Sequence, residues 1–171
     1  TDNVIINVYD VTANVYTVTY IADNETYCTQ KVVYNNKAQK PKSPIKPGYT
    51  FTGWFKGETQ WSFDAEICED LELEAKFEPL HYKVSVPENR SEFTVNVTSD
   101  SQVEHGGSFS FNITAADGYN VSDMTVYANG ILLEKKSENG DTVYFEISNI
   151  TEETVVTVRG IGQNTYSVTY N

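Results

Sequence analysis

The residue types that most often carry catalysis are scarce in this sequence of 171 residues. Its two histidines, His81 and His105, stand without a Gly-x-Ser-x-Gly elbow, a His-Glu-x-x-His pair or a nearby cysteine partner. The acidic pairs Glu69-Asp70 and Glu152-Glu153 could cleave glycosidic bonds only across a deep cleft, which small β modules rarely provide. We therefore expect no catalytic residue and a chain that is not an enzyme.

The two cysteines and the acidic turns are the candidates for cross-linking and metal binding. Cys28 and Cys68 could form a disulfide in an oxidising compartment or remain two free thiols. Neither has another cysteine or a histidine at metal-ligand spacing. The acidic turn at residues 138–141 lacks the alternating ligands of a calcium loop and is expected to be solvated. The sequence therefore predicts no metal and no cofactor.

Aromatic residues are the remaining candidates for ligand contacts, since the chain has 12 tyrosines, 8 phenylalanines and 2 tryptophans. Trp61, Tyr119 and Tyr127 could form an exposed platform on which a glycan stacks. The chain would then be a carbohydrate-binding accessory module of a secreted enzyme. Aromatic rings buried in compact cores would instead favour a structural or adhesive module.

The charge balance limits the classes of partner. Twelve Lys and Arg against 24 Asp and Glu give a formal net charge of −12, which repels nucleic acid. No apolar stretch reaches the roughly 18 residues that a membrane-spanning helix needs, so no membrane insertion is expected. Few Cys and Met beside many Thr, Ser, Asn and Tyr are typical of secreted bacterial wall proteins. We expect an extracellular location, at the bacterial cell surface or secreted.

Strand periodicity dominates the elements that must position these residues. Apolar side chains alternate with polar ones at residues 4–9, 16–20 and 108–113, as in strands with one buried face. A short helical turn is plausible only near residues 37–40, and the prolines that follow would end it. The chain is therefore expected to be mainly β.

An internal repeat indicates a modular array. Residues 1–20 align without gaps on residues 151–170, with seven identical positions. With a boundary at Pro79, which cannot donate to a strand ladder, we expect four segments. They are a strand remnant of a preceding module at 1–12, one module at 13–79, a second at 80–160 and the start of a following repeat at 161–171. Residues 3–9 and 166–170 are expected to pack on the complete modules or to pair with neighbouring molecules, because unpaired strands recruit others.

The first module resembles the Listeria–Bacteroides repeat, also called the internalin B-type repeat, over residues 16–78. The resemblance rests on YTVTY at 16–20, KVVYNNKAQKP at 31–41, GYTFTGWF at 48–55, WSFD at 61–64 and DLELEAKF at 70–77. It implies a small β-grasp-like sheet with a short helical crossover, found as tandem modules in bacterial surface proteins. The rings expected to fill its core are Tyr49, Phe51, Trp54, Phe55 and Phe77. Trp54 faces away from Phe51 in a regular strand, unless a bulge at Gly53 returns it to the core.

The second module is predicted to contain seven short strands, at 82–86, 93–98, 108–115, 121–127, 131–134, 142–147 and 154–159. Asn129-Gly130 is its clearest hairpin signal. Seven strands in so short a segment favour an immunoglobulin-like β-sandwich, similar to modules of bacterial surface proteins. The whole sequence therefore predicts a non-catalytic segment of a bacterial cell-surface protein that acts as a stalk or an adhesion module. Its expected partners are an unknown protein or glycan on a host or neighbouring cell and the adjacent modules of the same chain.

Overall fold

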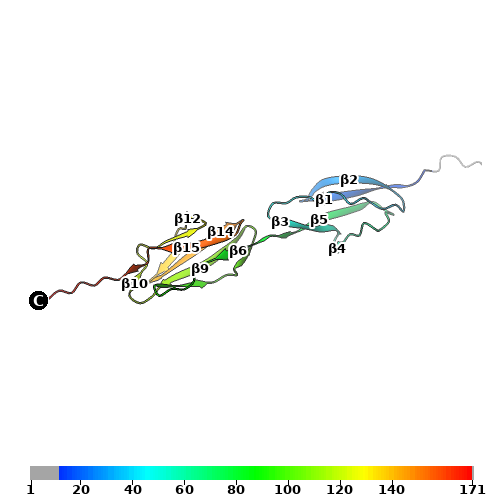
Figure 1. The fold of residues 1–171 in the computed structure, drawn as a ribbon. Helices are drawn as coiled ribbons and strands as arrows, with labels where there is room; N and C mark the ends of the chain where they lie inside the picture. The colour runs from blue at the N-terminus through cyan, green and yellow to red at the C-terminus, as the bar shows by residue number, and fades with distance from the viewer. Residues whose placement is uncertain (1–11, 171) are drawn as a thin grey trace, which may run out of the picture. The chain divides into compact units, whose positions relative to one another are not determined.

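The computed structural model describes residues 12–170, and the chain divides into two compact units between Glu78 and Pro79 (Figure 1). Each unit encloses an apolar core of its own. The described residues contain strands and no helix, so the predicted mainly β fold is confirmed. The β-grasp-like and immunoglobulin-like classes stay predictions. The strand remnant expected at 1–12 and the packing expected of residues 3–9 fall on residues 1–11, which lie outside the described part.

One five-stranded sheet forms the first unit. Its strands are β1 (Val15–Ala22), β2 (Glu25–Val33), β3 (Tyr49–Lys56), β4 (Thr59–Gln60) and β5 (Leu71–Pro79), and their order across the sheet is β2-β1-β5-β3-β4. β1 and β2 form an antiparallel hairpin that turns at Asp23 and Asn24, whose φ angles of 50° and 64° suit a two-residue turn. β1 and β5 are parallel neighbours, although Val18 and its partner Leu71 lie 53 positions apart in the sequence.

Trp54 lies at the centre of the first core. Its side chain is 1% exposed, and its ring centroid lies 4.9 Å from that of Tyr20 and 5.5 Å from that of Phe51. Gly53 between the two β3 rings has a φ of 154°, a conformation that side-chain-bearing residues rarely adopt, and it turns Trp54 to the same side as Phe51. Trp54 is therefore a core residue and does not cover the opposite face of the sheet. The other buried members are Val18, Val32, Ala38, Ile67, Leu71 and Leu73.

The connection between β2 and β3 is an irregular loop, so the helical turn expected at residues 37–40 and the helical crossover are wrong. The Gln30 side chain accepts a hydrogen bond from the Gln39 backbone N–H at 3.0 Å and donates one to the Gln39 carbonyl at 2.6 Å. The Tyr20 hydroxyl donates to the same carbonyl at 3.1 Å. These side chains satisfy the backbone groups that a helical turn would have used, and they tie the loop to the sheet.

The second unit consists of two larger sheets and one strand pair. One sheet contains, in order across it, β12 (Ile131–Leu132), β11 (Thr125–Ala128), β15 (Thr154–Arg159), β6 (His81–Ser85) and β8 (Gln102–Glu104). The other contains β13 (Ser137–Asn139), β14 (Thr142–Ile150), β9 (Gly107–Ala115) and β7 (Phe93–Val97). The pair consists of β10 (Tyr119–Asn120) and β16 (Gly162–Gln163). Each of the seven expected segments contains a strand, and the short strands β8, β10, β13 and β16 are additional.

The core of the second unit is built on alternating residues of its long strands. Phe109 and Phe111 of β9 are buried, and the Phe111 ring stacks on that of Phe145 in β14 at 5.4 Å. The hairpin signal at Asn129-Gly130 is found as the turn between β11 and β12. Here, too, strand alternation places the apolar side chains on the buried face.

The C-terminal segment leaves the second unit after residue 164. Ile161 packs against the core, and the backbone N–H of Asn164 donates to the Gly118 carbonyl at 2.8 Å. Beyond this point Tyr166, Val168 and Tyr170 are 82%, 74% and 92% exposed. The expected packing of residues 166–170 on a complete module of this chain is therefore not found. The matching position in the first unit, between β2 and β5, is already occupied by β1.

Candidate functional site

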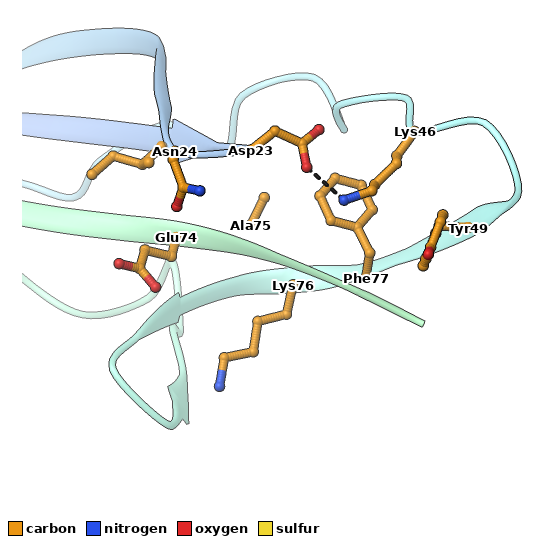
Figure 2. A pocket seen from close by; sticks show the side chains of 9 residues that line it. Asp23, Asn24, Lys46, Tyr49, Glu74, Ala75, Lys76 and Phe77 are labelled. Carbon is orange, nitrogen blue, oxygen red and sulfur yellow. Dashed lines mark hydrogen bonds and ion pairs between the residues drawn. The ribbon is translucent and has the colours of Figure 1, made fainter. Parts of the chain in front are cut away.

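A pocket at the hairpin end of the first unit brings charged and aromatic side chains together (Figure 2). Its volume is about 370 Å³, within the usual range for small-molecule sites. The β1–β2 turn, the loop before β3 and the end of β5 form its walls. The lining residues are Ile21, Asp23, Asn24, Lys46, Tyr49, Glu74, Ala75, Lys76 and Phe77.

Lys46 is the central charge of this pocket. Its Nζ donates a hydrogen bond to Asp23 at 2.6 Å and lies 4.9 Å from the Tyr49 ring centroid and 5.4 Å from that of Phe77. The hydrogen bond to Asp23 raises the pKa of the Lys46 ammonium. Figure 2 shows Lys76 pointing away from this pair, and its Nζ forms an ion pair with Glu58 at 2.6 Å.

The contacts of Lys46 indicate a structural role for this pocket rather than a catalytic one. The Lys46 ammonium is occupied by a carboxylate and two ring faces, contacts that stabilise its charged form. The contacts attach the irregular loop before β3 to the β1–β2 turn and to β5. Among residues 12–170, no group of three or more His, Cys, Asp or Glu side chains is placed to hold a metal ion. We interpret the pocket as a polar clamp between the loop and the hairpin.

The five rings expected in the first core occupy different positions. Trp54 is buried, and Phe51 packs against the core and contacts Phe77 at 5.7 Å between ring centroids. Tyr49, Phe55 and Phe77 are half-buried at the margin, where Lys46 or Lys76 covers their faces. The alternation in residues 16–20 could have identified a further core ring, Tyr20, which is 0% exposed.

The three residues expected to stack on a glycan are divided between the two units. Trp61 belongs to the first unit, packs against its core and has its indole Nε1 buried. Tyr119 and Tyr127 belong to the second unit, on β10 and β11. Tyr119 packs against the core, and the Arg159 guanidinium lies 5.4 Å from the Tyr127 ring centroid. Each ring is thus engaged by groups of its own unit.

Cys28 and Cys68 are both free thiols, so the disulfide considered from the sequence is not formed in this structure. Cys28 lies in β2 beside Tyr20 and is partly buried, and burial raises the pKa of its thiol. Cys68 is exposed in the segment before β5, and its Sγ contacts Asn35 Oδ1 at 3.4 Å. The two side chains have different environments, one against the core and one at the surface.

The histidines make local contacts within the second unit. His81 Nε2 lies 3.8 Å from a Glu104 carboxylate oxygen. The Nδ1 of His105 lies 3.4 Å from the Tyr82 hydroxyl. Neither contact includes a serine, a cysteine or a second carboxylate in the order that a nucleophilic triad requires.

The ring pattern of the first unit coincides with a known family. Residues 16–76 match the Listeria-Bacteroides repeat domain. The resemblance drawn from YTVTY, GYTFTGWF and DLELEAKF is therefore confirmed. The repeat begins in β1 and ends in β5, so it includes the hairpin, the loop before β3 and the polar clamp. It leaves the second unit outside the match.

Two relatives extend this finding. Internalin H of Listeria monocytogenes serovar 1/2a is 46% identical over 55 residues, which cover 30% of this chain and 10% of internalin H. A "Putative membrane protein" of Evansella cellulosilytica is 26% identical over 156 residues, which cover 79% of this chain and 23% of that protein. The chain therefore spans from a tenth to about a quarter of the length of these relatives. In residues 12–170, no helix has the length and hydropathy that crossing a bilayer requires.

Proposed function

We propose that this chain is a non-catalytic segment of a bacterial cell-surface protein, in which it acts as a stalk or as an adhesion module. The observation that carries the proposal is the match of the first unit to the Listeria-Bacteroides repeat domain, together with its similarity to internalin H. The alignment over both units with the Evansella cellulosilytica protein gives further support. The partner we propose is a protein or glycan on a host or neighbouring cell.

The distribution of side chains supports a structural role. Tyr20 and Trp54 are buried in the core of the first unit, and the buried phenylalanines of the second unit fill its core. The net charge of −12 keeps such a chain soluble and makes neighbouring units repel one another. A stalk or adhesin needs these properties and does not need a reactive centre.

The exposed C-terminal segment supports an array in which the two kinds of unit alternate. Residues 164–170 read NTYSVTY and residues 14–20 read NVYTVTY. In β1, Val18 and Tyr20 are 0% exposed between β2 and β5, whereas Val168 and Tyr170 are 74% and 92% exposed. The same alternating pattern is thus buried once and exposed once. We propose that residues 164–170 are the first strand of a following repeat.

Accessibility on intact cells tests the surface location. Antibodies raised against the purified chain are expected to label intact cells that produce the parent protein, and external trypsin is expected to remove the labelling. A cytoplasmic protein of the same cells should survive the trypsin and serves as the control. Labelling that requires permeabilised cells would overturn the proposed location.

Glycan-array binding separates the stalk from the carbohydrate-binding alternative. The intact chain is compared with its Trp61→Ala variant. Glycan binding that Trp61→Ala abolishes, while the fold is retained, would replace the stalk proposal by the carbohydrate-binding one. The stalk proposal expects no such loss.

A tandem chimera tests the array. The chain is extended after Tyr170 with a second copy of residues 21–79, which lacks all of β1 except its last two residues. If residues 164–170 act as β1, the added copy folds. The tryptophan that corresponds to Trp54 in this copy then becomes buried, and the backbone amides of residues 166–170 become protected from hydrogen exchange. Val168→Lys should prevent this folding, whereas Thr169→Lys on the opposite face should permit it.

A chimera carrying Thr165→Val and Ser167→Thr restores the β1 sequence and calibrates the fluorescence of the folded state. An added copy that stays unfolded, or that folds while 166–170 exchange freely, would disprove the array proposal.

A further inference from the structure

The first unit begins and ends in strands that are parallel neighbours. β1 is the first strand of the unit and β5 is the last, and they pair from Val18 with Leu71 to Ile21 with Glu74 (Figure 1). We call the hydrogen-bonded segment shared by two such strands a strip. Because the two strands are parallel, the start of β1 and the end of β5 lie at opposite ends of their strip. A pull on the two ends of this unit therefore runs along the strip, in opposite directions on its two strands.

The second unit repeats this arrangement with a different sheet. Its first strand, β6, is parallel to β15, and Val84 and Ser85 pair with Thr154 and Val155. β15 is followed by the two-residue strand β16, which among the described strands pairs with β10 alone. A pull on the C-terminal end would detach β16 first and then load the strip between β6 and β15.

The same additional hydrogen bond extends both strips. In the first unit, the Thr17 backbone N–H donates to Asp70 Oδ1 at 2.7 Å, one position before the Val18–Leu71 pair. In the second unit, the Lys83 backbone N–H donates to Glu153 Oε1 at 3.1 Å, one position before the Val84–Thr154 pair. Each acceptor is thus the acidic residue immediately preceding the last long strand of its unit.

The strips also lie over the cores. Val18, Tyr20 and Leu73 are 0% exposed in the first unit. Val84 and Val156 are each 3% exposed in the second, where the Thr154 side chain is buried as well. Water thus has little access to one face of each strip, and sliding the strands apart would expose core side chains.

We propose that each unit is a mechanical clamp that resists tension along the chain. Loading parallel neighbours in opposite directions stresses all hydrogen bonds of the strip together, whereas pulling the strands apart from one end breaks the bonds one after another. The carboxylates of Asp70 and Glu153 add a charge-assisted bond to each strip. This inference rests on the proposed stalk role and deepens it, because it identifies in both units the strand pair that resists tension.

Single-molecule force measurements on the full chain test the clamp through the direction of pulling. With Cys28→Ser in every sample, one handle is fixed at the N-terminus and the other at the C-terminus or at the exposed thiol of Cys68. Cys68 precedes β5, so the second geometry peels β1 from β5, beginning at the end of the strip where both strands start. The first unit is expected to unfold at a higher force when pulled through the chain ends. Equal unfolding forces in the two geometries, or a higher force through Cys68, would overturn the mechanical-clamp proposal.

Acidic-residue variants test the additional bonds under end-to-end load. Asp70→Ala is expected to raise the unfolding rate of the first unit at constant force roughly threefold to tenfold, and Glu153→Ala that of the second unit only. Glu72→Ala and Glu134→Ala remove the same charge from exposed positions and should leave both rates nearly unchanged.

The two unfolding events differ in the length of chain that they release, which assigns each event to its unit. Equal effects of Asp70→Ala and Glu72→Ala would refute the role of the additional bond. The force measurement uses the isolated chain, so its result does not depend on the cell-labelling test. A parent protein found inside the cell would refute the surface location without refuting the mechanical clamp.

Discussion

Tyr20 should make the first unit less stable as the pH rises above about 10. Its side chain is fully buried, its ring packs on Trp54, and its hydroxyl donates to the Gln39 carbonyl at 3.1 Å. Burial raises the pKa of Tyr20 from 10.0 to about 12, with a smaller contribution from Cys28. The folded unit therefore keeps the phenol proton at pH values where the unfolded chain has lost it.

The direction of the pH effect follows from this difference. Between about pH 10 and about pH 12 the folded state binds more protons than the unfolded state, so the free energy of unfolding falls as the pH rises. The contribution is fully present below pH 10 and is lost through pH 12. A hundredfold difference in proton affinity corresponds to about 3 kcal/mol, of which roughly half is lost by pH 11.

Tyr20→Phe removes the titrating group together with one hydrogen bond. The bond is worth about 1 kcal/mol or less, because the Gln30 amide also donates to the Gln39 carbonyl and keeps it satisfied. At pH 8 the variant should be less stable than the wild type by that amount. At pH 11 it should equal or exceed the wild type, since it has no phenol to ionise at this position.

Urea unfolding followed by tryptophan fluorescence measures this effect, because Trp54 and Trp61 both belong to the first unit. Tyr34→Phe, at a residue that is 48% exposed, is the matched control and should shift stability little at either pH. If Tyr20→Phe and the wild type differ by the same free energy at pH 8 and at pH 11, the reasoning from burial is refuted.

Further predictions concern two glycines and the thiols. Gly53→Ala should destabilise the first unit by about 1 to 3 kcal/mol in the same urea assay, because φ is 154°, a backbone conformation that residues with a Cβ rarely adopt; unchanged stability would contradict this argument from backbone strain. At Gly160, φ is 75° and an added Cβ would overlap the Asp123 carbonyl oxygen. Gly160→Ala should therefore lower the melting temperature of the second unit in calorimetry and leave that of the first unit unchanged. Thiol labelling under native conditions should be faster at Cys68, which is exposed, than at Cys28, whose pKa burial raises; equal rates would argue against this difference.

Much of the local structure could be predicted because it depends on nearest neighbours. Alternating apolar residues at 16–20 and 108–113 form β1 and part of β9, since alternation determines which face a strand buries. Asn129-Gly130 forms its hairpin because both residues tolerate positive φ. The helical turn at 37–40 failed because the competing hydrogen bonds come from Gln30 and Tyr20, which are distant in the sequence.

The candidate site was predicted less well than the elements that carry it. Trp61, Tyr119 and Tyr127 were grouped by residue type, and the structure places Trp61 in the first unit and the two tyrosines in the second. The polar clamp at Lys46 was not foreseen, because its partner Asp23 lies 23 positions away and only the hairpin turn brings them together.

The sequence by itself determined that the chain is built of strands, that its first unit carries a recognisable ring pattern and that residues 164–170 resemble residues 14–20. Those properties are written in residue type and local spacing. Only the tertiary structure decided that β1 lies beside β5 and β6 beside β15, that Trp54 turns inward and that the two thiols stay apart. Pairing between strands that lie 50 or more positions apart depends on how whole strands pack around one core. Local residue spacing does not determine which distant strands become neighbours.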